Sequence, residues 1–568
     1  MVTRTMKKQS LTRLAITVIA IAVAAYLVGL ARWRIDLTQD KRYTLQPVTR
    51  EYLEGLTDTI KLDIYLDGDM PLGFKRLQRS LRELLDEFRV VAGRHLQYAF
   101  IDPQKLGANP KQRNELLKRL QQQGIEPTSV QQRSPDGALS QQVIYPGLIM
   151  RSRSKALPIN LLRNNPALSG DENLNQSTQN LEFALMDGIM RLCSDSLPKL
   201  AFIHGHGELD EYQTGDIERA LLDYFDVYRI APNGDLDALN GFTAAIVAGP
   251  TQPMPEADKL VLDQFIMRGG RVLWLVSPVS VSTDSLSTGA TTMAMENEHN
   301  LGDMLFRYGA RLNPMLLQDL QCAVIPVNVA PEGQQSKFVP APWVYYPLMV
   351  APADNPITRN LNLIQGKFVS PIDTVGGNPL IQKQVLLRTS AYSNMFQVPV
   401  FVSLAEINRE PNQREFRHAH VPVAVLLQGQ FTSAFRNRPL GRFNHQRPFS
   451  FAEQSVPTKM VVVADASIIS NDVQRRPSGA YVMPLGYDRY TQQTYGNKDF
   501  VLNAMKYLTD DEGLMTLRAR DFKLRLLDRK RIAASRLRWQ LLNMLLPPAL
   551  LLLGGGIWLW IRHWRYAR

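Results

Sequence analysis

The chain has 568 residues, enough for two or three domains with their own hydrophobic cores, and its net charge is +12. With 45% hydrophobic and 21% charged residues, its composition excludes a disordered or fibrous chain. The basic residues concentrate beside two apolar segments and do not alternate with aromatic residues, so we expect no nucleic-acid partner.

Two long apolar segments lie near the ends of the chain. Residues 14–31 contain no charged side chain, and neither do residues 541–561. Each segment is long enough to cross about 30 Å of hydrocarbon as a helix, and three tryptophans near the end of the second suit a membrane interface. We therefore predict two membrane-spanning helices. A cleaved signal peptide is the alternative for the first segment, since Gly-Leu-Ala at 29–31 is a passable cleavage site.

Basic residues outside the two spans predict the orientation of the chain. Arg and Lys residues occur in both tails, residues 1–13 and 562–568, and positively charged flanks favour the cytoplasm. We expect both tails to be cytoplasmic and the body between the spans to be exported. The basic segment at residues 516–540 opposes this orientation, because residues 518–538 alone carry nine Lys or Arg. We predict a solvated face against anionic headgroups, with a partner-docking surface as the alternative.

The first part of the exported body, residues 36–195, alternates strand-like and helix-like segments. Residues 60–66 alternate apolar and polar side chains as a half-buried strand does, and residues 74–91 place leucines at helical spacing. The complete predicted order is β-α-β-α-β-β-α, which is that of a thioredoxin-like α/β layer. The cysteine pair of thioredoxin chemistry is missing, so we expect no redox activity.

A second α/β unit is predicted at residues 196–515. Its continuous apolar runs, residues 242–250 and 271–278, are typical of buried parallel strands. A helix is predicted between them, with a proline near its start and two glycines at its end. Strands that alternate with helices predict a parallel sheet with right-handed crossovers. Residues 282–298, rich in Ser, Thr and Asn, are expected to form a surface loop.

The stretch LAFIHGHGELDE concentrates polar side chains after a short apolar run. His204, His206 and Glu208 stand at spacing two, so an extended chain would point all three to one side, and zinc accepts such ligands. Gly205 and Gly207 instead favour a turn, in which this alignment is lost. We predict a structural turn at the end of a buried strand. A polar binding edge is the first alternative, because α/β proteins bind ligands at this position, and a metal or catalytic site is the second.

Other motifs give no sign of catalysis. The chain contains no G-x-S-x-G, H-E-x-x-H or Walker A sequence, so we predict no enzyme activity, no catalytic residue, no metal and no cofactor. Any energy from ATP must then come from another subunit. Cys193 and Cys322 stand in no C-x-x-C or metal spacing; they either form a disulfide or are buried thiols, which we favour. Asp465 and Ser467 follow an apolar strand and predict a helix cap first and a ligand contact second.

Several stretches, in order along the chain, resemble one family. They are RIDLTQDKRYTLQPVTREYLEGL after the first span, NLEFALMDGIMRLC, HGHGELDE, LDQFIMRGGRVLWLVSP and GNKDFVLNAMKYLTDDEGLMTLRARDFKLRLLD. The chain resembles the GldG family, the exported auxiliary, substrate-binding-like subunits of gliding-motility-associated ABC transport systems of Bacteroidetes. The resemblance extends from the first span to the last residues.

The resemblance implies a protein anchored at both ends in the bacterial inner membrane, with its body in the periplasm. It also implies a multi-span permease and a cytoplasmic ATPase as partners, and a glutamine-amidotransferase-like α/β layer, shared with an intraflagellar-transport subunit, for residues 196–515. We therefore expect a non-catalytic transport component. The alternatives are an envelope amidotransferase-like hydrolase that uses His204, His206 and Glu208, and a periplasmic sensor or scaffold.

Overall fold

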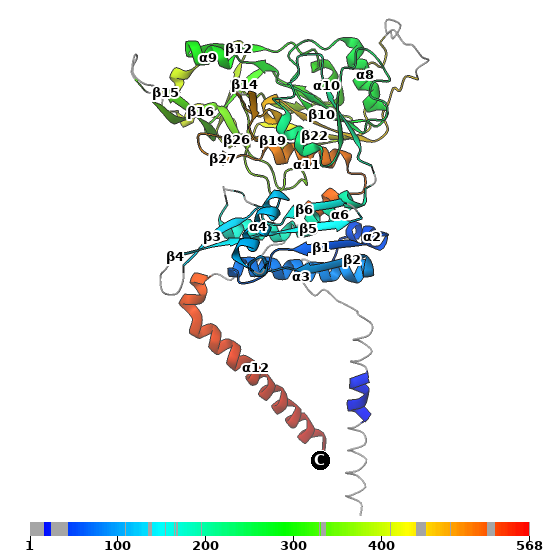
Figure 1. Cartoon of the computed structure of the whole chain (residues 1–568), viewed down its shortest axis with the longest axis vertical. Coiled ribbons are helices and arrows are strands. Elements are labelled where there is room, and N and C mark those ends of the chain that lie inside the picture. The colour runs from blue at the N-terminus through cyan, green and yellow to red at the C-terminus, as the bar shows by residue number, and fades with distance from the viewer. Residues whose placement is uncertain are drawn as a thin grey trace, which may run out of the picture. The chain divides into compact units, whose positions relative to one another are not determined.

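The structure is a computed structural model of the chain (Figure 1). It describes residues 16–23, 44–107, 109–133, 139–153, 155–163, 165, 168–194, 196–328, 330, 337–408, 411–438, 450–477, 479–519 and 529–566. The chain divides into two compact units, Met1–Arg520 and Asp521–Arg568, and each is described by itself. Of the predicted first span, the structure describes residues 16–23, which are helical with exposed side chains. The rest of that span lies outside the described residues.

The N-terminal part of the first unit is a four-stranded sheet with helices (Figure 1). Its elements are α2 (Pro47–Glu54), β1 (Ile60–Ile64), α3 (Leu72–Ala92), β2 (Leu96–Phe100), α4 (Pro110–Gln122), β3 (Thr128–Arg133), β4 (Leu139–Ile144), β5 (Gly147–Ser152), β6 (Lys155–Asn160), α5 (Gly170–Gln179) and α6 (Leu181–Cys193). The sheet order is β2-β1-β5-β6, in which β1 and β2 are parallel and β5 is antiparallel to both of its neighbours. The predicted order of elements occurs within this series, to which α2, the β3–β4 hairpin and a second final helix are additions.

Helix α3 shows why this part of the sequence folds as predicted. Leu77, Leu81, Leu85 and Phe88 recur every three or four residues and are fully buried. They share one hydrophobic core with strand residues such as Leu62. We call this core the N-terminal core, and this part of the first unit the N-terminal layer. A helix with one apolar side gains its stability by burying that side against a sheet, so the spacing of these side chains is sufficient to predict the helix.

The central part of the first unit is a seven-stranded sheet. Its strands are β7 (Lys199–Ile203), β8 (Asp226–Ile230), β9 (Ala244–Ala248), β10 (Arg271–Leu275), β19 (Ile381–Arg388), β22 (Pro422–Gly429) and β23 (Thr458–Val463). The order is β19-β22-β23-β10-β9-β7-β8. The five strands from β23 to β8 are parallel, as predicted, whereas β22 and β19 add an antiparallel edge.

Helices cover both faces of the central sheet. They are α7 (Gly215–Leu221), α8 (Glu256–Met267), α10 (Gly302–Tyr308) and α11 (Asn497–Thr509). Successive strand residues point to opposite faces, and in β10 Leu273 packs in a core with residues of α7 and α11, whereas Trp274 packs in a core with residues of α8 and α10. Because both faces are covered, the strands need apolar residues at consecutive positions, which explains the continuous apolar runs.

Much of the chain between β10 and β23, and the segment after β23, forms small sheets. These parts contain β11 (Val279–Ser280), α9 (Thr283–Gly289), β12 (Thr291–Glu296), β13 (Ala310–Leu312), β14 (Met315–Asp319), β15 (Cys322–Asn328), β16 (Phe338–Met349), β17 (Ile364–Gln365), β18 (Ile372–Thr374), β20 (Ser393–Gln397), β21 (Val400–Ser403), β24 (Val473–Arg476), β25 (Gly479–Val482), β26 (Tyr487–Asp488) and β27 (Gln493–Thr494). The predicted surface loop at 282–298 is wrong, because α9 and β12 occupy it. Ser282 caps α9, and β12 pairs with β21 about a hundred residues further on, a contact that local composition does not reveal.

The second unit contains α12 (Arg529–Tyr566), a helix that is kinked at Ser535, where φ is −125° and ψ is 20°. Its stretch Ser535–Arg565 is apolar and long enough to cross a membrane, and it is the one such helix among the described residues. Its leucines are exposed, with Leu551 at 78%, and an exposed apolar helix surface is what lipid contacts in a membrane. The predicted second span, residues 541–561, lies inside this candidate.

The basic segment predicted at residues 516–540 is not solvated throughout. Arg518 is only 7% exposed, and its guanidinium donates to the carbonyl oxygen of Arg359 at 3.0 Å and to Oδ1 of Asn503. The reason is the short helix η6 (Leu514–Ala519), which places Met515 and Leu517 in the N-terminal core and so draws Arg518 inward. Residues 520–528 lie outside the described residues.

Candidate functional site

The predicted turn after β7 is present and is built around two glycines. The backbone N–H of His204 still pairs with the carbonyl oxygen of Ile230, at 3.0 Å. Gly205 and Gly207 then have φ values of 119° and 75°, a backbone conformation that glycine adopts without steric cost. A Cβ atom on Gly207 would stand 2.2 Å from Oγ1 of Thr251. Glycine therefore permits the close approach of this turn to the loop that follows β9.

His206 points inward from this turn and lies between two carboxylates. Its Nδ1 is 2.9 Å from Oε1 of Glu208, and its Nε2 is 2.8 Å from Oδ2 of Asp258. The three side chains are 5%, 1% and 8% exposed, respectively. Asp258 comes from the first turn of α8, where the helix dipole favours a negative charge. Two carboxylates from different elements thus share one buried imidazole.

The contacts of His206 determine its protonation state. Hydrogen bonds to Asp258 and to Glu208 raise the pKa of His206 from 6.5 to about 9, although burial acts in the opposite direction. At neutral pH the ring is therefore protonated and donates from both nitrogens. The remaining carboxylate oxygens also accept, Oε2 of Glu208 from the backbone N–H of His206 at 2.7 Å and Oδ1 of Asp258 from that of Gly234 at 2.5 Å. Every side-chain polar atom of the three residues is thus engaged.

The predicted site residues are not all brought together. The side chain of His204 is exposed, whereas His206 and Glu208 face each other in the interior. The third member of the cluster, Asp258, was not among the predicted residues. It stands 52 positions from His206, and its local signal is only that of an acidic residue in the first turn of a helix, which is also a common stabilising feature.

This cluster lies where the order of the parallel strands reverses. From β7 the chain passes to β8 on one side and then to β9 on the other side of β7, and α/β proteins commonly bind ligands in the crevice at such a point. Here the backbone N–H groups of Thr251 and Gln252 donate to the carbonyl oxygen of His206 at 3.1 and 2.9 Å. The two loops are thus bonded to each other, and the arrangement is suited to holding the turn in place.

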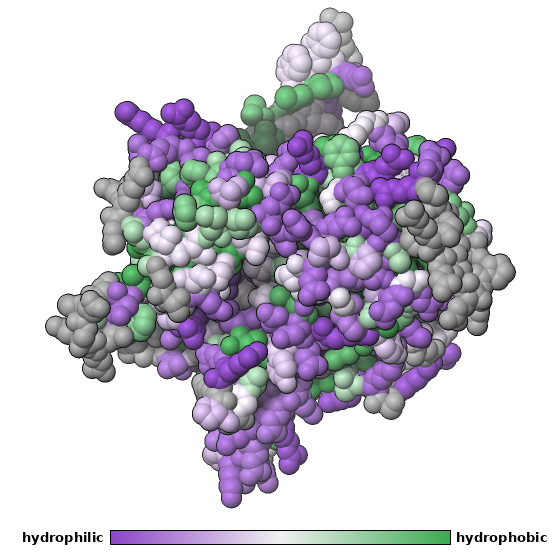
Figure 2. All heavy atoms as spheres, turned by 90° about the horizontal axis from the view of Figure 1, so that it is seen from above, coloured by the Kyte–Doolittle hydropathy of each residue, from purple (hydrophilic) through white to green (hydrophobic). Residues whose placement is uncertain are grey.

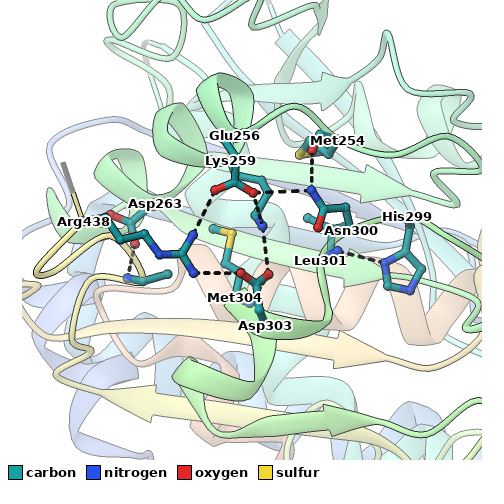
Figure 3. Close-up of polar contacts among 11 residues, drawn as sticks. Met254, Glu256, Lys259, Asp263, His299, Asn300, Leu301, Asp303, Met304 and Arg438 are labelled. Atoms are coloured by element: carbon teal, nitrogen blue, oxygen red, sulfur yellow. Dashed lines mark hydrogen bonds and ion pairs between the residues drawn. The ribbon is translucent and has the colours of Figure 1, made fainter. Parts of the chain in front are cut away.

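A second polar cluster surrounds Lys259, the residue after Asp258 (Figure 3). The ammonium group is 1% exposed and pairs with Oε1 of Glu256 and Oδ1 of Asp303, both at 2.8 Å. Arg438 bridges the other oxygens of the same two carboxylates, at 2.9 Å each. Two cations and two anions therefore compensate one another and fasten α8 to α10.

Asp465 caps the short helix η5 (Ala466–Ile469), as predicted. Its Oδ1 accepts from the backbone N–H of Ser467 at 2.7 Å, and its Oδ2 accepts from the Ser467 hydroxyl at 2.8 Å. Burial raises the pKa of Asp465 from 3.8 to about 6. The helix cap is confirmed, and the ligand contact stays a prediction.

The other predicted features concern metal ligands and thiols. Within the ranges that the structure describes, no group of three or more His, Cys, Asp or Glu side chains is arranged to hold a metal ion. Cys193 ends α6 and Cys322 begins β15; neither is in a disulfide, and both are half-buried and so more exposed than predicted. Burial raises the pKa of the Cys322 thiol to about 11, which makes it a poor nucleophile at neutral pH.

Two helices that are far apart in the sequence meet in a partly buried polar contact. Lys506 on α11 donates to Oδ1 of Asp187 on α6 at 2.9 Å, and each side chain is 15% exposed. The hydroxyl of Tyr224 donates to Oδ2 of Asp187 at 3.1 Å, and Nζ of Lys506 lies 3.7 Å from the centre of the Tyr224 ring. A cavity of about 400 Å³ adjoins these three residues. The contact ties the central sheet to the N-terminal layer.

Comparisons with known proteins give the chain a family. Residues 39–151 match a model described as a domain of unknown function, DUF7088. No curated protein matches. Among solved structures, the mmIFT52 N-terminal domain is similar at 13% identity with a TM-score of 0.31, and the match covers 55% of this chain and 98% of that one. Residues 197–504, more than half of the chain, match a model described as an ABC-type uncharacterized transport system, and the chain therefore belongs to this family of ABC transport auxiliary proteins.

Proposed function

We propose that the chain is a non-catalytic, membrane-anchored component of an ABC-type transport system associated with gliding motility or envelope export. The observation that carries this proposal is the family match over residues 197–504, in a chain whose α12 is long and apolar enough to span a membrane. A multi-span permease supplies the transport path, and a separate cytoplasmic ATPase supplies the energy, since the chain has no Walker A sequence.

The proposed arrangement places the body in the periplasm. Spans at residues 14–31 and 541–561 anchor it in the inner membrane, and both tails are cytoplasmic. The face of the protein seen in Figure 2 supports an aqueous surrounding, because hydrophilic residues cover most of it and hydrophobic residues form smaller groups between them.

The fold classes of the two parts of the body belong to the same proposal. The order β2-β1-β5-β6, with one parallel and two antiparallel pairs, supports a thioredoxin-like layer at residues 36–195. The central parallel sheet with helices on both faces supports a glutamine-amidotransferase-like layer at residues 196–515. Both fold classes rest on sheet topology, which does not by itself imply an activity or an active-site residue.

The cluster around His206 supports a role without catalysis. A general base needs a free lone pair that reaches a substrate, but both ring nitrogens of His206 donate to buried carboxylates. At the position where the strand order reverses, the backbone N–H groups of Thr251 and Gln252 donate to the carbonyl oxygen of His206 and so join the two loops. We assign the cluster the structural role of locking the turn after β7 to α8, and the hydrolase alternative would require this lock to open.

The chain segment before α12 offers a route for mechanical coupling. Helix α11 contributes Phe500 and Met505 to a core of the central sheet, and its Lys506 pairs with Asp187 of the N-terminal layer. The following helix η6 places Met515 in the N-terminal core. In this proposal, movement of the permease displaces the second span, and this segment passes the displacement to both layers of the body.

Membrane co-purification tests the partners. The full chain, carrying an affinity tag, is extracted in a mild detergent, and the bound proteins are identified by mass spectrometry. We expect one multi-span permease and one ATPase in stoichiometric amounts. Recovery of the chain alone, or ATP hydrolysis by the chain alone, would contradict the proposal.

Two substitutions in α12 separate partner binding from general damage. Leu551→Lys places a charge in the middle of the candidate span, where insertion is disfavoured by about 3 kcal/mol. This variant should lose the partners, although the first proposed span still holds the chain in the membrane fraction. Leu537→Lys lies near the basic end of the helix and is 73% exposed, so it should keep the partners. Equal behaviour of the two variants would argue against a membrane role for α12.

A further inference from the structure

A cavity of about 430 Å³ lies at the carboxyl edge of the central sheet, outside the His206 cluster. Pro278, which follows β10, and Pro253, which follows β9, form part of its wall together with Pro314. The volume falls in the range of small-ligand sites, and the carboxyl ends of parallel strands are the usual position of such sites. Prolines also keep the wall rigid, because their φ angle is fixed.

His299 is the one side chain of this wall that combines deep burial with a free hydrogen-bonding atom. The residue is 7% exposed, and its Nδ1 accepts from the backbone N–H of Leu301 at 3.0 Å (Figure 3). Burial lowers the pKa of His299 from 6.5 to about 4, so the ring is neutral and the proton is on Nε2. Nε2 has no hydrogen-bond partner among the described residues and is on the side of the ring away from Leu301 (Figure 3).

The loop that carries His299 is held in place by its own contacts. The amide of Asn297 donates to the carbonyl oxygens of Pro250 and Ser277 at 3.1 and 3.0 Å. The amide of Asn300 donates to the carbonyl oxygen of Met254 at 3.1 Å. The geometry of the wall is therefore present before any ligand binds, which reduces the entropy cost of binding.

Two carboxylates give the cavity its charge. Glu296 and Glu298 line it, both are exposed, and neither has an ion-pair partner within the described part of the chain. The cavity therefore offers two negative charges, one neutral N–H donor and an apolar proline wall. A ligand that satisfies all three needs a cation, a hydrogen-bond acceptor and an aliphatic stem between them.

We propose that this cavity binds a lysine or arginine residue of an extended peptide. The ammonium or guanidinium group pairs with Glu296 and Glu298, the alkyl stem lies against the prolines, and a backbone carbonyl oxygen accepts from Nε2 of His299. A basic peptide segment of a transported protein or of a partner subunit would carry this chemistry. The inference rests on the cavity alone and stands independently of the transport role.

Three small probes test the proposal by calorimetry on the full chain in detergent micelles. N-acetyl-lysine methylamide carries all three features, N-acetyl-norleucine methylamide lacks the cation, and pentylamine lacks the carbonyl group. We expect the lysine derivative to bind about tenfold more tightly than either of the others, which is the effect of one charged hydrogen bond. Equal binding of the norleucine derivative, or of pentylamine, would overturn the proposal.

Two variants with the same change in net charge locate the binding. The double substitution Glu296→Gln and Glu298→Gln should weaken binding of the lysine derivative about tenfold. The matched pair Glu83→Gln and Glu115→Gln, both exposed in the N-terminal layer, should leave it unchanged within about twofold. An equal loss of affinity in the two double variants would mean that the net charge of the protein, and not this cavity, determines binding, and it would refute the site.

The contact at His299 has its own measurement. Nitrogen NMR of the labelled histidine rings should show a shift of the Nε2–H signal of His299 with the lysine derivative and none with pentylamine. This readout does not depend on the folding of a His299 variant. An unchanged His299 signal at saturating lysine derivative would refute the assigned contact.

Discussion

Nε2 of His206 lies 2.8 Å from Oδ2 of Asp258, although 52 residues separate them in the chain. The contact joins the turn after β7 to the first turn of α8 at the carboxyl edge of the sheet. A buried ion cluster of this kind contributes little when compared with an apolar replacement, but removal of one partner leaves an uncompensated charge. Single substitutions in this cluster should therefore lower the free energy of unfolding.

Replacement of His206 should destabilise the protein far more than replacement of its neighbour His204. His206→Ala leaves two buried carboxylates without their cation and should lower the free energy of unfolding by about 3 kcal/mol. His204 is exposed, so His204→Ala should change it by no more than about 0.5 kcal/mol. Urea unfolding of the full chain in detergent measures both values. Similar losses would contradict the buried position of His206.

The stability that His206 contributes should fall at alkaline pH. Because its pKa is raised from 6.5 to about 9, the folded state holds a proton that the unfolded state releases between these two values. The contribution is therefore complete below about pH 6.5 and lost as the pH passes about 9, and its full size is roughly 3 kcal/mol. The difference in unfolding free energy between the wild type and His206→Gln should shrink from pH 6 to pH 10. A constant difference would refute the raised pKa.

Two glycines with similar backbone angles should respond differently to substitution. Gly207 and Gly241 have φ values of 75° and 79°, but a Cβ atom meets Thr251 only at Gly207 and open space at Gly241. Gly241→Ala should cost only the strain of a left-handed backbone, roughly 1 kcal/mol, and Gly207→Ala should cost more. Thr251→Ala alone removes the hydrogen bond that its hydroxyl donates to the carbonyl oxygen of Gly207 at 3.0 Å. In that background, the further loss caused by Gly207→Ala should be close to that of Gly241→Ala. A further loss as large as in the wild-type background would rule out the contact as the cause.

The pair formed by Lys506 and Asp187 should show strong energetic coupling. Lys506→Met leaves Asp187 unpaired, and Asp187→Leu leaves the ammonium unpaired, so each should cost about 3 kcal/mol. The double variant should lose less than the sum, with a coupling energy of about 1–3 kcal/mol in a double-mutant cycle. The exposed pair Arg50 and Glu54, at 68% and 56% exposure, is the control and should give no more than about 0.5 kcal/mol. Additive losses at the buried pair would argue against a tight seam between the two layers.

Local patterns were sufficient to predict much of the fold. The leucines of α3 recur at helical spacing, the apolar runs of β9 and β10 indicate buried parallel strands, and the glycines beside His206 indicate a turn. The structure contains each of these elements. They follow from the sequence because helix periodicity, strand burial and positive φ angles depend on residues a few positions apart.

Contacts between distant residues could not be read in this way. Asp258 reaches His206, Lys506 reaches Asp187 and β12 pairs with β21 only after the sheet and its helices have packed. An acidic residue in a first helical turn or a lysine on a helix has the same local signal whether it is solvated or buried in an ion cluster. The partners of such charged groups are set by packing across the whole chain. The local sequence pattern therefore predicts the helices and strands, and only the tertiary structure determines which charged side chains pair with one another.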